Sequence, residues 1–280
     1  MIKNFFFLTI FFVTTNMFAF DPYESEPAAP FVLTVPHIAG AIDISNPDEF
    51  MGIFEDLEKY IKRGEGKVTI LEKIDIFLKR LQENNPSRNF VTGLAINQLL
   101  LVQQLVSVLD NINRFYDSFL QGISHLKGEF KYLNKGIIIN RKPLVANPPS
   151  SQIKIGVVVE FLNNLDSFIT EQLETININI MPLLQQKSVV ESIYPEKDNN
   201  NARFPQVWEA LKLVAKKLSF LMGQYDGFLY MTKEYAKEKD LRAAGLKHFK
   251  SLRYPVTFIA KKGLRGPKKG KKWIEFVYKD

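Results

Sequence analysis

The residues best suited to chemistry in this chain are seven lysines and arginines gathered near its C-terminus. They fall within a glycine-containing stretch of twelve residues, flanked by Phe258 and Trp273. Clustered cations bind phosphates, anionic lipids or acidic polysaccharides, and an adjacent aromatic ring adds stacking contacts. The candidate polyanion-binding residues are Lys261, Lys262, Arg265, Lys268, Lys269, Lys271, Lys272 and Trp273.

Charge is distributed unevenly along the chain. The formal net charge is +7, whereas residues 247–280 alone hold eleven lysines and arginines against two acids, a net +9. Residues 21–246 hold 25 basic and 28 acidic side chains, so the body of the protein is mildly acidic. Such asymmetry is typical of an interaction segment, and the alternative is a solvated tail whose lysines only aid solubility.

Other residue types give little support for catalysis or metal binding. His37, His125 and His248 lie far apart, and no Glu precedes either helical histidine by three residues, as di-metal helical bundles require. The absence of cysteine excludes disulfides, thiolate ligands and a cysteine nucleophile. We therefore predict no catalytic, cofactor-binding or metal-binding residue and no cofactor, and no small-molecule substrate is evident.

Two catalytic motifs are ruled out, one by its spacing and one by its absence. Residues 266–271 resemble part of a phosphate-binding loop, but the glycines are one residue too close and Lys272 occupies the Ser/Thr position. No Gly-x-Ser-x-Gly sequence is present. The sequence thus favours a non-enzymatic role and leaves one enzymatic alternative, a pocket between helices that could use His125. This alternative requires a polar cleft near His125, Asp117 or Glu129.

The element expected to organise the fold is a long helix from Val91 to Leu133. Apolar residues recur there at alternating steps of four and three, and no proline interrupts them. At 1.5 Å per residue, such a helix would be roughly 65 Å long. Gln98 is the single polar residue in this apolar seam, so we predict it as the place for a specific partner contact.

Further helices are expected on both sides of it. Helix start and stop signals predict an antiparallel helical hairpin over Ser45–Glu83. A fourth helix begins near Ser151, with a strand as the alternative over residues 174–180, and Pro182 should kink or break it before the apolar pattern resumes. A fifth helix begins near Pro205 and continues to Tyr235, with continuation or a restart over residues 241–253.

Both ends of the chain differ from this helical body. Residues 256–260 and 273–278 are β-like runs around the basic loop, which predicts a hairpin that packs on the helices or stays mobile. Residues 1–19 have the charge and apolar run of a signal peptide, with an uncleaved anchor or buried helix as the alternative. Residues 20–44 contain four prolines and predict an extended arm or a disordered spacer. No other segment was expected to reach a charge-free transmembrane length.

Together these patterns predict a mainly all-α protein: an elongated antiparallel bundle of about five helices over residues 45–253, with a small basic hairpin-like tail at 254–280. We expect an exported, secreted or periplasmic protein with a structural or protein-interaction role in the cell envelope or exterior. The first alternative is a polyanion-binding module that acts through the basic tail. Partners would be another protein or a polyanionic surface, and the heptad seams also permit oligomerisation as a coiled coil.

Overall fold

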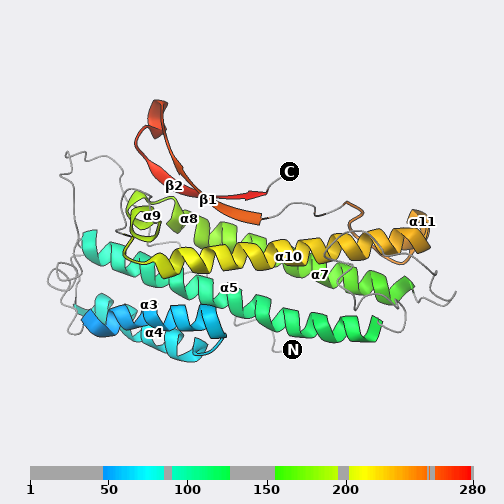
Figure 1. The fold of residues 1–280 in the computed structure, drawn as a ribbon, viewed down its shortest axis with the longest axis horizontal. Helices are drawn as coiled ribbons and strands as arrows, with labels where there is room; N and C mark the ends of the chain where they lie inside the picture. Colours follow the sequence, from blue (N-terminus) through cyan, green and yellow to red (C-terminus); the bar gives the residue numbers. More distant parts are fainter. Residues whose placement is uncertain are drawn as a thin grey trace, which may run out of the picture.

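The computed structural model describes residues 47–84, 90–126, 155–194, 202–250, 252 and 256–278. Within these ranges the helices lie side by side along one long axis, and a two-stranded antiparallel sheet lies against one side of them (Figure 1). The predicted class, mainly α with a C-terminal β-hairpin, is confirmed. The predicted signal peptide, the proline-rich arm and His37 lie outside the described residues.

Helix α5, Phe90–Leu126, occupies the centre of the bundle and contacts α4, α7, α9 and α10. The predicted seam is buried from Ala95 to Ile112 and again at Phe119. Because Leu94, Leu99 and Val106 on a second side are buried too, several neighbours must cover this helix. The last seven residues of the predicted helix, 127–133, lie outside the described residues.

The composition of α5 corrects one expectation. Residues 93–122 are long and apolar enough to cross a membrane, contrary to the prediction that no such segment follows the N-terminus. However, 56% of the most apolar window is buried inside the structure. A helix covered by neighbours on two sides has the same apolar composition as a membrane-spanning helix, because both lie in surroundings without water.

Helices α3, Pro47–Arg63, and α4, Lys67–Asn84, form the predicted antiparallel hairpin. Gly64 and Gly66 between them have φ of 76° and 89°, a left-handed conformation that residues other than glycine rarely adopt. The hairpin lies alongside the bundle, since α3 contacts α10 and α4 contacts α5. Phe54 stacks on Phe204 at 4.2 Å between ring centroids, which fixes α3 against the start of α10.

The chain changes its helical geometry just before Pro182. Helix α7, Ile155–Thr175, leads into a π-helical turn, η2, at Ile176–Ile180, and then into two short helices, α8 at Met181–Leu184 and α9 at Lys187–Ile193. Pro182 has no N–H group, so it cannot donate the hydrogen bond that a regular helix needs at that position. Just before it, the N–H of Met181 bonds to the carbonyl of Ile176, five residues earlier, as in a π-helix. The predicted break is therefore a widened turn followed by short helices, and the strand alternative is wrong.

Helix α10, Pro205–Tyr235, is the second long helix of the bundle and begins and ends where the sequence predicted. A short helix, α11 at Glu238–Ala243, follows it, and Gly245 with φ of 89° turns the chain away. The helical restart expected over residues 241–253 is therefore limited to α11. Strands β1, Val256–Lys262, and β2, Lys272–Tyr278, then form the predicted hairpin.

Candidate functional site

The basic hairpin is attached to the bundle through one face. Val256 pairs with Tyr278 and Phe258 with Phe276, so every second residue of each strand faces the same way. On this face Val256, Phe258 and Ile274 are buried, and the strands contact α8, α9 and α10. An isolated two-stranded hairpin is only marginally stable in water, so this apolar attachment holds it in place.

The opposite face of the hairpin carries Trp273 and Lys261, which both contact the carboxylate of Glu275. The indole N–H of Trp273 donates to Oε1 of Glu275 at 2.8 Å, and Nζ of Lys261 forms an ion pair with Oε2 of the same carboxylate. These hydrogen bonds, that from Lys261 first, lower the pKa of Glu275 below its usual value. Nζ of Lys268 lies over the Trp273 ring, 4.8 Å from the ring centroid, in a cation–π contact.

The loop between the strands is folded, with its own hydrogen bonds. The N–H of Gly263 donates to the carbonyl of Lys271, and the N–H of Gly270 donates to the carbonyl of Gly263, both at 2.9 Å. A 3₁₀ turn at Gly266–Lys268 lies between them. A Cβ atom on Gly263 would lie 1.7 Å from the carbonyl oxygen of Lys268, so only glycine fits there.

The structure separates the predicted cations into two groups. In the first group each side chain has a partner. Lys261 pairs with Glu275, Lys268 lies over the Trp273 ring, and Lys272 pairs with Glu191 of α9 at 3.9 Å. The other group consists of exposed side chains that form no ion pair within the described residues: Lys262, Arg265, Lys269 and Lys271. Described residues 256–278 hold seven lysines and arginines and one acid, Glu275, so the hairpin is strongly positive.

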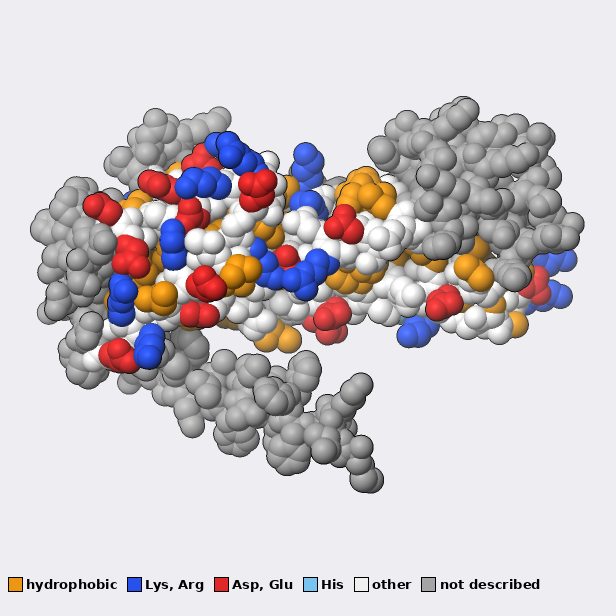
Figure 2. Space-filling view, turned by 90° about the horizontal axis from the view of Figure 1, so that it is seen from below, with side chains coloured by type: hydrophobic (Ala, Val, Ile, Leu, Met, Phe, Trp, Pro, Cys, Tyr) orange, Lys and Arg blue, Asp and Glu red, His pale blue; other side chains and the backbone are white. Residues whose placement is uncertain are grey.

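On the opposite side of the molecule, the described residues carry charges of both signs. Seen from below, acidic and basic side chains are interspersed over α3 and α4 (Figure 2). Several of them form ion pairs, including Lys62 with Glu58 and Arg80 with Glu49. Among the described residues, the hairpin therefore carries the largest unbalanced positive charge.

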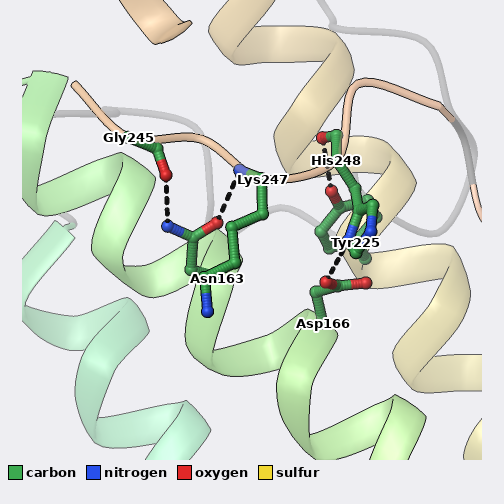
Figure 3. Close-up of polar contacts among 6 residues, drawn as sticks. All are labelled: Asn163, Asp166, Tyr225, Gly245, Lys247 and His248. Carbon is green, nitrogen blue, oxygen red and sulfur yellow. Dashed lines mark hydrogen bonds and ion pairs between the residues drawn. The ribbon is translucent and has the colours of Figure 1, made fainter. Parts of the chain in front are cut away.

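A second polar cluster, missed by the sequence analysis, joins α7, α10 and the segment after α11. Nδ1 of His248 bonds to Oδ2 of Asp166 on α7, and the hydroxyl of Tyr225 on α10 donates to the backbone carbonyl of His248 at 2.8 Å (Figure 3). Asn163 accepts a hydrogen bond from the N–H of Lys247 and donates to the carbonyl of Gly245. These side chains hold residues 245–248 against α7 and α10.

The chemistry of this cluster is dominated by its buried carboxylate. Asp166 is only 5% exposed, whereas the His248 ring lies mostly in solvent. Burial first, and then the negative charges of Asp166 and Asp226, raise the pKa of Tyr225, so its hydroxyl remains a donor. A carboxylate that orients an imidazole can support general base catalysis. In the described part of the chain, however, no nucleophilic side chain is bonded to His248, and no three metal-ligating side chains come together.

One sequence signal could have pointed to this cluster. Asp166 lies on the apolar stripe of α7, between Leu165 and Ile169, where a charged side chain must find a partner. The pattern shows that a partner is required, but it cannot show that His248, 82 residues away, supplies it.

The prediction that Gln98 makes a partner contact is wrong. Its side chain is 0% exposed, and its amide nitrogen donates to the hydroxyl of Ser192 on α9 at 2.6 Å. The hydroxyl of Ser192 in turn donates to the carbonyl of Val189. Gln98 therefore makes a hydrogen bond inside the protein that connects α5 to α9.

The described residues do not test the predicted enzymatic alternative. Asp117 is exposed on α5, while Glu129 and the side chain of His125 lie outside the described part. Comparisons of the chain with protein-family models, with curated proteins and with solved structures found no match. The geometry of the hairpin and of the bundle therefore carries the functional argument.

Proposed function

We propose that this protein is an exported, non-enzymatic helical bundle that presents its basic hairpin to a polyanionic partner. The observation that carries the proposal is the hairpin loop, which is folded and anchored and holds four exposed cations that form no ion pair with any described acid. Lys262, Arg265, Lys269 and Lys271 form this group, called here the tip cations. Clustered cations that lack internal partners bind anionic groups and release the counterions of that partner.

The anchoring of the hairpin favours binding over the alternative of a tail that serves solubility. A flexible tail would lose conformational freedom when it binds, whereas a folded loop already holds its cations in place. Phe258 and Ile274 fix the strands to the bundle, and Gly263 fixes the loop. The bundle thus acts as a rigid support for a charged projection.

The proposed location follows from the N-terminal residues. Residues 1–19 have the composition of a signal peptide, and we propose that the protein is secreted or periplasmic. An exported protein meets polyanions of the cell envelope or exterior more readily than chromosomal nucleic acid. The seams that could pair chains as a coiled coil are buried within one chain over α5 and α10, so we propose that a single chain binds.

The test is to neutralise the four tip cations together by substitution with glutamine. We expect affinity for heparin and for anionic vesicles to fall roughly a hundredfold or more, because each cation near an anionic surface contributes about 1 kcal/mol. Retention on heparin at increasing salt and co-sedimentation with vesicles measure the effect.

The matched control removes the same charge elsewhere. Lys216, Lys237, Lys239 and Lys250 are exposed on other segments and form no ion pair within the described residues. Their replacement by glutamine lowers the net charge equally and should change retention far less. Equal losses in the two variants would mean that net charge, and not the hairpin, governs binding. If the unaltered protein binds neither heparin nor vesicles, the proposal fails.

A further inference from the structure

An exposed leucine lies within the basic loop. Leu264 is 81% exposed, the highest value among the large hydrophobic side chains that the structure describes. Single exposed apolar residues are ordinary on protein surfaces. Leu264 differs because it lies between Gly263 and Arg265 in a loop whose other side chains, from residue 265 to 271, are all exposed and mostly basic.

The backbone of the loop keeps Leu264 in this position. Gly263 is bonded to both Lys271 and Gly270, and its close approach to Lys268 leaves no room for a side chain. The paired part of β1 ends at Lys262, and Leu264 comes directly after Gly263. The loop also lies at the end of the hairpin that projects from the bundle, so a flat surface could reach it without meeting the helices (Figure 1).

We infer that the polyanionic partner is the surface of an anionic phospholipid bilayer, with Leu264 inserted below the headgroups and the tip cations at the phosphates. This inference rests on the proposed function of the hairpin. A bilayer offers negative charge with hydrocarbon directly beneath it, and peripheral proteins bind it through basic residues combined with buried apolar side chains. Both chemical types are adjacent in this loop.

Other polyanions match the loop less well. Nucleic acids and acidic polysaccharides would pair with the cations and could stack on an open aromatic face. In this hairpin Lys268 covers a face of Trp273, and the indole N–H is bonded to Glu275. Those partners would also leave Leu264 in water, whereas a bilayer buries it.

The experiment compares Leu264→Asn with the unaltered chain. The substitution removes the apolar group without changing charge, so affinity for vesicles of phosphatidylcholine and phosphatidylglycerol should fall roughly tenfold or more. Retention on heparin should not change. Both proteins keep the same N-terminus, so any binding by the apolar residues 5–13 is equal in both.

Two further variants sharpen the result. Val68→Asn alters an exposed apolar side chain on α4, far from the hairpin in the sequence, and should leave vesicle binding unchanged. Leu264→Trp should show a blue shift of its fluorescence on these vesicles, beyond any change from Trp208 and Trp273, and none on phosphatidylcholine alone.

The outcomes separate this inference from the function on which it rests. Loss of vesicle binding in Leu264→Asn with intact heparin retention supports the bilayer as the partner. Equal binding of Leu264→Asn and the unaltered protein to vesicles overturns the inference, while salt-sensitive heparin retention that needs the tip cations keeps the polyanion function. If the tip cations prove unnecessary for both heparin and vesicles, the proposed function and the inference fail together.

Discussion

Gly263 shows how one residue controls the shape of the basic hairpin. A Cβ atom added at Gly263 would lie 1.7 Å from the carbonyl oxygen of Lys268, so any side chain would displace the loop. Neither charge nor apolar periodicity distinguishes this glycine from Gly266 or Gly270. Its role depends on a contact across the loop, which only the folded hairpin creates.

At the residue scale we predict that Gly263→Ala weakens binding to heparin although every charge is kept. The added methyl group costs about 1–3 kcal/mol of local distortion, so the loop no longer holds its cations in one arrangement. Salt elution from heparin measures the loss. The matched control is Gly52→Ala in α3, where a Cβ meets no atom within 4 Å and the helix should gain about 0.5–1 kcal/mol. Unchanged retention of Gly263→Ala would show that the loop geometry is irrelevant to binding.

At the scale of elements, the α3–α4 hairpin is held by ion pairs as well as by its apolar faces: Arg80 of α4 pairs with Glu49 of α3, and Asp56 of α3 pairs with α4 as well. Asp56 of α3 forms ion pairs with Lys73 of α4 and, at 3.1 Å, with Lys59. Burial by itself would raise the pKa of Asp56, but hydrogen bonds from Lys73 and Lys59 outweigh burial and lower it. The carboxylate therefore stays charged in the folded protein at a pH where the unfolded chain already binds a proton.

This pKa shift predicts acid sensitivity of a definite sign. Because the pKa is lower in the folded state, the stabilisation is complete above the unfolded value of about 4 and is lost as pH falls through the lower folded value. Asp56→Asn should therefore show a smaller decline of melting temperature below about pH 4, and lower stability by no more than about 1 kcal/mol at neutral pH. Thermal melts followed by circular dichroism measure both.

The control for this prediction is Glu55→Gln, which removes an exposed acid on the same helix that forms no ion pair within the described residues. Its acid dependence should match that of the unaltered protein. If Asp56→Asn and Glu55→Gln give the same pH profile, the ion pairs of Asp56 do not contribute to stability in acid.

At the scale of the whole molecule, the helices share one hydrophobic core. Buried residues of α3, α5, α7 and α10 belong to a single cluster that extends to Phe258 and Ile274 of the hairpin. A continuous core makes unfolding cooperative, since no helix can leave without exposing the apolar faces of its neighbours. The hairpin therefore depends on the bundle for its attachment.

We predict that Leu109→Asp, at the centre of α5, unfolds the bundle. Leu109 is 1% exposed, and an unpaired charge there costs more than such a protein's usual margin of about 5–15 kcal/mol can readily absorb. Leu120→Asp on the same helix is the control, because Leu120 is 45% exposed and its replacement should change stability by less than about 1 kcal/mol. Helical circular dichroism and the melting temperature distinguish the two. An unaltered melt of Leu109→Asp would mean that α5 is not buried as described.

Much of the fold follows from local pattern. The spacing of apolar residues predicted α3, α4, α10 and the described part of α5, because a helix buries residues that recur every three or four positions. Two β-like runs on either side of a basic glycine-rich loop predicted the hairpin, because short strands joined by such a loop pair with each other. Residue types alone also named the cations that form the candidate site.

Contacts between distant residues were decided only by the tertiary structure. Pairing of Asp166 with His248 and of Gln98 with Ser192 joins residues more than 80 positions apart, and no local pattern encodes such a partner. The same holds for the division between Lys272, which lies near Glu191, and the tip cations, which form no ion pair with a described residue. Sequence determined which residues are apolar or charged and at what period. Packing determined which of them meet, because proximity depends on how the elements are placed in space.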